Sequence, residues 1–96
     1  MPAGYIIAHI DVTDPQQYEQ YKVLSSKAMQ EHGAEVLVRG GQVQQLEGEW
    51  NPTRVVLLKF PSVEAARGFY EGETYRAARK ARENAARMNM IVVEGV

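Results

Sequence analysis

The sequence predicts an α+β fold in which a four-stranded antiparallel sheet carries helices on one face. Two observations lead to this prediction. Runs of β-branched and aromatic residues, typical of strands, alternate along the chain with segments that repeat apolar residues at helical spacing. The order of these segments is β-α-β-β-α(α)-β, and right-handed crossovers convert that order most simply into such a sheet.

The first half of the chain predicts a strand, a helix and a second strand. Residues 4–12 are rich in strand-forming residues. Asp14 then suits a helix N-cap, Pro15 suits the first helical position, and Gln17 stands where a capping-box partner belongs. The residues that follow at helical spacing, up to a stop at Gly33, are Tyr18, Tyr21, Leu24, Ser25, Ala28 and His32. Residues 34–47 predict a long strand, with a bulge or bend at Gly40-Gly41.

The second half predicts a turn, a strand, two helices and a closing strand. The turn covers residues 49–53 and the strand residues 54–60. Ser62 caps a helix over about residues 63–71 that ends near Gly72. A further helix is expected from about 74 to 87, because small and apolar residues share one side: Ala77, Ala78, Ala81, Ala85 and Met88. With a last strand at 90–94, the chain predicts one ferredoxin-like domain over residues 1–96.

Composition excludes several function classes. The 96 residues contain no Cys and carry a formal charge of −1, so disulfides, thiolate chemistry and an electrostatic drive toward nucleic acid or anionic membrane are not expected. The apolar N-terminal run lacks a basic flank and is too short for a bilayer, which predicts a cytoplasmic protein without a membrane partner. His9 and His32 lie on different elements, and no phosphate loop or RNA-stacking aromatic pair is present. We therefore expect no metal, no cofactor and no nucleic acid.

Alternation along the strands separates two faces of the predicted sheet. One set is wholly apolar and should face the helices: Ile6, Ala8, Ile10, Val12, Val36, Val38, Val56, Leu58 and Phe60. The other is mixed: Tyr5, Ile7, Leu37, Val55 and Leu57 with His9, Asp11, Arg39 and Lys59. Left open, the mixed face would expose more apolar surface than soluble monomers usually tolerate, which predicts a homodimer through this face. Alternatively, a bulge shifts the alternation of side chains between the two faces, and the exposed apolar patch does not exist.

Polar residues of the mixed face form the candidate ligand site, together with a Trp in the turn. The set is His9, Asp11, Arg39, Trp50 and Lys59. His9 could act as a general base, with Asp11 near it on the same face. Alternatively, His9 is an interface residue whose hydrogen bonds are satisfied, and Asp11 holds a loop. Arg39 could bind a carboxylate beside the two glycines, or pair with Glu47 or an acid of a partner. Trp50 could cover the mouth of the cleft or pack on the partner subunit.

The chain resembles the DUF1330 domain family of the dimeric α+β barrel superfamily over almost its whole length. The matching segments are Asp11-Val12-Thr13-Asp14-Pro15 with Tyr18, Val38-Arg39-Gly40-Gly41, Glu47-Gly48-x-Trp50-x-Pro52-x-Arg54, Phe60-Pro61-Ser62, Ala65-Ala66, Tyr70, Tyr75, Arg82 and Val93-Glu94-Gly95-Val96. The resemblance implies a ferredoxin-like subunit and a homodimer whose sheets pack together. It implies no established activity, and relatives in the superfamily carry out different chemistries on one fold.

Two functions follow from these observations, and whether the protein is an enzyme stays open. The leading hypothesis is a cytoplasmic homodimer that binds a small organic molecule, of the anionic class that Arg39 suits, in a cleft between the sheets, as a cofactor-independent enzyme or a carrier. The alternative is a non-catalytic assembly or regulatory module whose polar cleft residues only pair across the dimer. The expected partners are a second copy of the chain and the small molecule.

Overall fold

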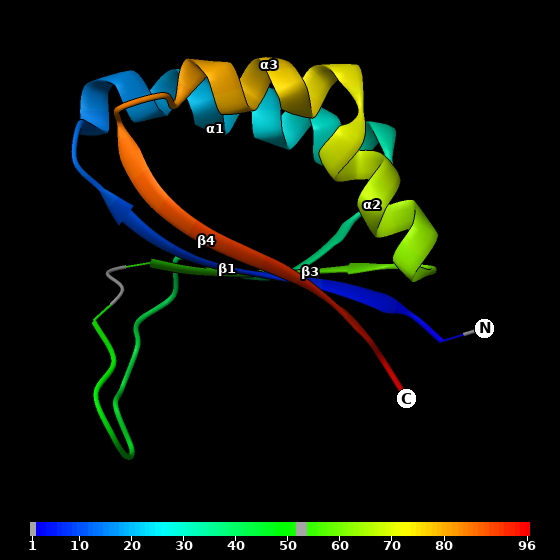
Figure 1. The fold of residues 1–96 in the computed structure, drawn as a ribbon, viewed down its shortest axis with the longest axis horizontal. Coiled ribbons are helices and arrows are strands. Elements are labelled where there is room, and N and C mark those ends of the chain that lie inside the picture. Colours follow the sequence, from blue (N-terminus) through cyan, green and yellow to red (C-terminus); the bar gives the residue numbers. More distant parts are fainter. Residues whose placement is uncertain (1, 52–53) are drawn as a thin grey trace.

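The computed structural model describes residues 2–51 and 54–96, and it confirms the predicted α+β architecture (Figure 1). Its elements are β1 (Gly4–Val12), α1 (Pro15–Glu31), β2 (Glu35–Arg39), β3 (Arg54–Phe60), α2 (Val63–Glu71), α3 (Glu73–Ala81) and β4 (Ala86–Glu94). The strands form one antiparallel sheet in the order β2-β3-β1-β4. All three helices lie on the same side of this sheet (Figure 1). Among the described residues, no helix combines the length and apolar character needed to cross a membrane.

The start of α1 confirms one predicted cap and corrects the other. The Asp14 carboxylate accepts a hydrogen bond from the Gln17 backbone N–H at 3.1 Å, as an N-cap does. Gln17 does not complete a capping box, because the Asp14 N–H already donates to the Ala85 carbonyl at 3.0 Å. The Gln17 amide instead donates to the carbonyls of Ala81 at 3.1 Å and Glu83 at 2.7 Å. It therefore ties the start of α1 to the turn that follows α3.

The second strand is much shorter than predicted. β2 ends at Arg39, and Gly40 turns the chain with a φ of 73°, in the left-handed region that favours glycine. The described residues that follow, 41–51, leave the sheet and project on the side opposite the helices (Figure 1). The predicted bulge exists but lies earlier, where the register shifts between Val36 and Val38. The predicted turn at 49–53 falls partly outside the described residues.

The last helix and strand divide differently from the prediction. α2 and its Ser62 cap are confirmed, with the Ala65 N–H donating to Ser62 Oγ at 3.1 Å. However, α3 ends at Ala81 rather than 87, and β4 starts at Ala86 rather than 90. Asn84 adopts a φ of 65°, and the Ala85 N–H donates to the Arg82 carbonyl at 2.9 Å, which closes a tight turn. Pairing with β1 along all of β4 outweighs the helical preference of this Ala-rich segment.

The core lies between the helices and one face of the sheet, as predicted. The apolar set of β1 and β3 is buried against side chains from the three helices: Ile6, Ala8, Ile10, Val56, Leu58 and Phe60 meet Tyr18, Tyr21, Ala28, Met29, Ala66, Phe69, Tyr75 and Ala78. Burial of this kind contributes about 1.5–3 kcal/mol for each large apolar side chain. The helix-covered face is therefore the one that holds the subunit together.

The opposite face of the sheet, which we call the open face, carries no helix (Figure 1). Strand register arranges its side chains in rows. The central row crosses all four strands and is entirely apolar, and we call it the apolar row: Val38, Leu57, Ile7 and Ile91. The rows beside it are more polar, with His9 and Asn89 on one side and Lys59 and Glu35 on the other. An uncovered apolar row through the middle of a sheet is typical of a surface that pairs.

Candidate functional site

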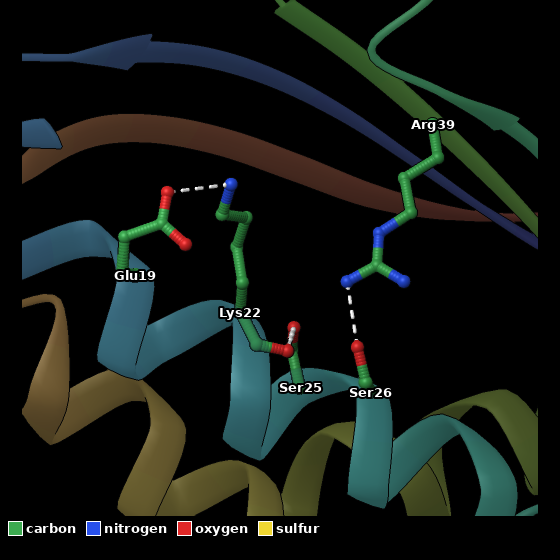
Figure 2. Close-up of polar contacts among 5 residues, drawn as sticks. All are labelled: Glu19, Lys22, Ser25, Ser26 and Arg39. Atoms are coloured by element: carbon green, nitrogen blue, oxygen red, sulfur yellow. Dashed lines mark hydrogen bonds and ion pairs between the residues drawn. The ribbon is translucent and has the colours of Figure 1, made fainter.

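Arg39 lies on the face opposite to the one predicted. The extra residue at the bulge shifts the alternation of β2, so Val38 pairs with Leu57 and Arg39 with Val56. Val56 is buried under the helices, and Arg39 therefore reaches toward α1 (Figure 2). There its Nη2 donates to Ser26 Oγ at 2.7 Å (Figure 2). The prediction that Arg39 shares the open face with His9 is wrong, because the bulge precedes Arg39 instead of following it.

The other predicted residues lie on the open face but only partly together. The rings of His9 and Trp50 are 4.4 Å apart between centroids, tilted by 59°, so Trp50 packs over β1. Asp11 lies one row further and pairs in register with Arg87 of β4. Lys59 faces Tyr5, four residues from His9 along β1, or roughly 13 Å at the rise of a strand. The five predicted residues thus occupy three separate places.

A groove of ligand size opens elsewhere, between α2 and β4. Its volume is about 570 Å³, within the range of small-molecule sites. The floor is apolar and the rim polar, and the lining residues are Ile6, Ala66, Arg67, Tyr70, Glu71, Arg82, Met88, Asn89, Met90, Ile91 and Val92. Arg67 and Glu71 neutralise each other at 3.3 Å on the rim. Arg82 has no ion pair among the described residues, and its Nε is shielded from solvent without a hydrogen-bond partner there.

Behind Arg82 lies a cluster of buried tyrosines from α1 and α3, the tyrosine cluster: Tyr18, Tyr21 and Tyr75. The hydroxyls of Tyr21 and Tyr75 are 2.6 Å apart, and the Arg82 guanidinium lies 5.6 Å from the centre of the Tyr21 ring. Burial raises the pKa of all three phenols above the ordinary value of tyrosine, although the charge of Arg82 opposes the rise. At neutral pH these groups are therefore protonated hydrogen-bond donors and not phenolate bases.

Sequence reasoning placed the tyrosines correctly in the core but missed two arginines beside them. Arg82 entered the prediction only as part of a family pattern, and Arg54 only as part of that pattern and as the start of a strand. Register supplies the signal for Arg54, because Arg54 pairs with Ile10 and therefore shares the inner face with Val56 and Leu58. Arg54 lines a small cavity of about 20 Å³ under α1, together with Arg39 and Lys22.

Comparison with known protein families shows to which family this chain belongs. The family model described as "Domain of unknown function (DUF1330)" matches residues 3–96. The chain belongs to this family. A comparison with curated proteins found no match. In the searched part of the structure, residues 2–51 and 54–96, this DUF1330 chain gathers no three His, Asp or Glu side chains that could hold a metal ion.

Solved structures resemble this DUF1330 chain over nearly its full length. A protein of unknown function from Rhodopseudomonas palustris has a TM-score of 0.76 at 20% identity, with 99% of this chain and 83% of that chain covered. A cofactor-independent oxygenase from Streptomyces nogalater, SnoaB, has a TM-score of 0.65 at 8% identity, with 97% and 92% covered. A dimeric ferredoxin-like protein of unknown function from Thermobifida fusca has a TM-score of 0.64 at 16% identity, with 97% and 91% covered. At such identities the likeness establishes the ferredoxin-like fold alone.

Proposed function

We propose that the protein is a homodimer, joined through its open face, in which each subunit binds a small organic anion in the groove between α2 and β4. The observation that carries the binding proposal is this groove, with its apolar floor and an unpaired guanidinium. The cleft expected from the sequence lay between two sheets, whereas the groove lies beside the helices of one subunit. A cytoplasmic location remains our prediction.

The groove suits a ligand with an apolar body. Ile6, Ala66, Met88 and Met90 supply its floor, and the thioether side chains of methionine adapt to ligands of irregular shape. Tyr70 adds an aromatic wall, which the Arg79 guanidinium fixes by lying 4.4 Å from the ring centre and donating to the hydroxyl at 3.2 Å. A planar or aromatic molecule matches this lining best.

Arg82 supplies the preference for an anion. Its guanidinium lines the groove, and among the described residues its charge has no acidic partner. A carboxylate on the ligand would satisfy that charge through strong, directional hydrogen bonds. The protonated tyrosine cluster behind Arg82 would hold the guanidinium in place. These groups can stabilise a developing negative charge, the kind of help that cofactor-independent chemistry needs.

The open face supports pairing of two copies. The sheet is four strands wide and up to nine residues long. At strand spacings of ~4.8 Å and a rise of ~3.3 Å, its face covers roughly 500 Å², or roughly 1,000 Å² for two copies, which reaches the size of specific interfaces. The apolar row runs through its centre, and the similar protein from Thermobifida fusca is described as dimeric. A second copy would cover the row with its own.

The alternative function is a non-catalytic assembly module. The apolar row favours it, since that row explains a dimer without any ligand. The ligand-binding function and the assembly function differ in whether a ligand occupies the groove. In the alternative, the groove stays solvated and Arg82 only stabilises the tyrosine cluster.

Binding of 2-naphthoate, an aromatic carboxylate of suitable size, tests the proposal. We expect saturable NMR shifts at the backbone amides of the groove, most clearly at Tyr70, Met88 and Met90. The neutral isostere 2-naphthalenemethanol should bind at least tenfold more weakly, because it cannot satisfy the Arg82 charge. Arg82→Met should weaken naphthoate binding by a similar factor.

Arg76→Met is the matched control, since Arg76 is an exposed arginine of α3, the helix that ends just before Arg82, and it does not line the groove. It should leave the affinity unchanged. Two results would reject the groove as an anion site and favour the assembly module. One is a set of naphthoate shifts that do not saturate, and the other is equal shifts in the wild type and in Arg82→Met.

A further inference from the structure

Three cationic side chains converge under α1, away from the groove. Lys22 comes from α1, Arg39 from the end of β2 and Arg54 from the start of β3, and all line the cavity of about 20 Å³. The other hydroxyl-bearing residues of its lining are Tyr18, Tyr21, Ser25 and Tyr75. Figure 2 shows Arg39 reaching from the sheet toward the α1 surface that carries Lys22 and Ser26. Positive charges that line one cavity repel one another unless anions lie near them.

Among the described residues, only one of these three cations has an acidic partner. Lys22 forms an ion pair with Glu19 at 2.9 Å (Figure 2). Neither arginine has a carboxylate within 4.0 Å among residues 2–51 and 54–96. Arg39 donates to Ser26 Oγ, a neutral partner, and the Arg54 Nε is shielded from solvent without a hydrogen-bond acceptor in the described part of the chain. A buried donor in this condition destabilises the fold unless a ligand satisfies it.

Gly40 makes the room for this arrangement. A Cβ atom at this position would overlap Nη1 of Arg54, so the guanidinium lies directly against the glycine backbone. The left-handed φ of 73° at Gly40 also favours glycine there. The Arg39-Gly40 pair and the distant Arg54 are therefore parts of one structure.

We propose that Arg39 and Arg54, with the Tyr18 hydroxyl, form a binding site for a carboxylate group. The guanidinium fork matches the two oxygens of a carboxylate, and two such forks can hold one group from two sides. The cavity of about 20 Å³ has room for about one water molecule, so it admits one carboxylate oxygen, and the rest of the ligand lies outside it, beside the exposed Arg39. Burial raises the Tyr18 pKa, so its phenol is available to donate a third hydrogen bond.

The carboxylate could belong to a free small acid or to one end of a longer molecule. The body of a longer molecule would lie outside the cavity, past the exposed Arg39, because the cavity is too small for it. The site does not depend on the groove, because none of its cationic residues lines the groove. The two proposals can therefore fail separately.

Titration with sodium acetate, against sodium chloride at equal ionic strength, tests the site. We expect acetate to raise the melting temperature and to shift the amides of Lys22, Ser26 and Gly40 in a saturable way, with chloride at least tenfold weaker. Arg39→Met should reduce the acetate affinity at least tenfold. Arg39 is exposed, so this variant is expected to fold, whereas Arg54→Met removes a more buried group and serves as the second variant.

Arg87→Met, at an exposed arginine of β4, is the control and should bind acetate like the wild type. The proposal would be overturned if acetate shifted these amides no more than chloride does. It would also be overturned if Arg39→Met showed the same acetate shifts as the wild type. Competition identifies the source of the carboxylate. Displacement of acetate by 1,4-naphthalenedicarboxylate indicates the end of a longer molecule, while failure of this compound to displace acetate indicates a free small acid. Arg82→Met should leave acetate binding intact, which separates this result from the groove.

Discussion

At the scale of single residues, the sequence predicts a role whenever the partner is close along the chain. Asp14 and Ser62 cap the helices that follow them, and each partner lies three residues away. Gln17 was assigned a capping box by the same reasoning, but its partners are Ala81 and Glu83. A sequence distance of more than 60 residues, as in this contact, gives no local signal.

Substitution Gln17→Glu separates the two interpretations. A capping box accepts glutamate as well as glutamine. In the observed contact, a carboxylate would face two carbonyl oxygens and could donate to neither, so we expect a loss of about 1–2 kcal/mol in the free energy of unfolding. Urea denaturation at pH 7 measures it. Gln16→Glu adds the same charge at the exposed neighbouring position and should be neutral or slightly stabilising. Equal stability of both variants would contradict the observed role of Gln17.

At the scale of elements, the positions of the strands were predictable, but one irregularity reversed a face. β1, β3 and α2 agree with the prediction because their periodicity is unbroken. In β2 a single extra residue moves Arg39 to the helix side and Val38 to the open face. No residue type in Val36-Leu37-Val38 signals the bulge, since all three suit a regular strand. The pattern of an arginine beside two glycines could be recognised in the sequence, but the position of Arg39 on the helix side could not, and the groove beside Arg82 was not predicted.

The contact of α1 with α3 gives a pH dependence. The phenols of Tyr18, Tyr21 and Tyr75 have pKa values raised above the ordinary 10.0, chiefly by burial. The folded protein therefore retains protons that the unfolded chain releases above pH 10. Their contribution to stability is complete below that pH and is lost as the pH rises toward the folded pKa values, by up to about 1.4 kcal/mol per pH unit for each group.

Denaturation between pH 8 and 11.5, with tyrosinate absorbance followed in parallel, checks this expectation. Ionisation of the cluster should coincide with unfolding. For each protein, the free energy of unfolding is compared with its own value at neutral pH, which removes the effect of losing the hydroxyl pair. On this scale, the stability of Tyr21→Phe should fall less steeply above pH 10 than that of the wild type. Cluster tyrosines that ionise in the folded protein near pH 10 would show that burial does not control them.

At the scale of the whole molecule, the topology leaves one apolar face of the sheet without helices. No single residue decides this. Three helices cover one face, and the structure leaves Val38, Leu57, Ile7 and Ile91 in a continuous row on the other. The prediction assigned faces to β1, β2 and β3 only, and among these the row differs from it in β2, where Val38 replaces Leu37. The conclusion survives the bulge because both residues are apolar. None of the described helices covers this row (Figure 1).

Substitution Ile91→Glu tests whether a second copy covers it. Ile91 is 56% exposed in the subunit, so a glutamate there should leave the subunit folded but place a charge in the centre of the paired faces. In sedimentation equilibrium we expect the wild type at twice the 10.8 kDa of one chain and the variant at 10.8 kDa. The melting temperature of the wild type should also rise with protein concentration, since association stabilises the folded state, while that of the variant should not. Val23→Glu adds the same charge at a position of α1 that is 71% exposed, and it should remain dimeric. A wild type at the mass of one chain, or an Ile91→Glu variant that still pairs, would exclude the open face as the interface.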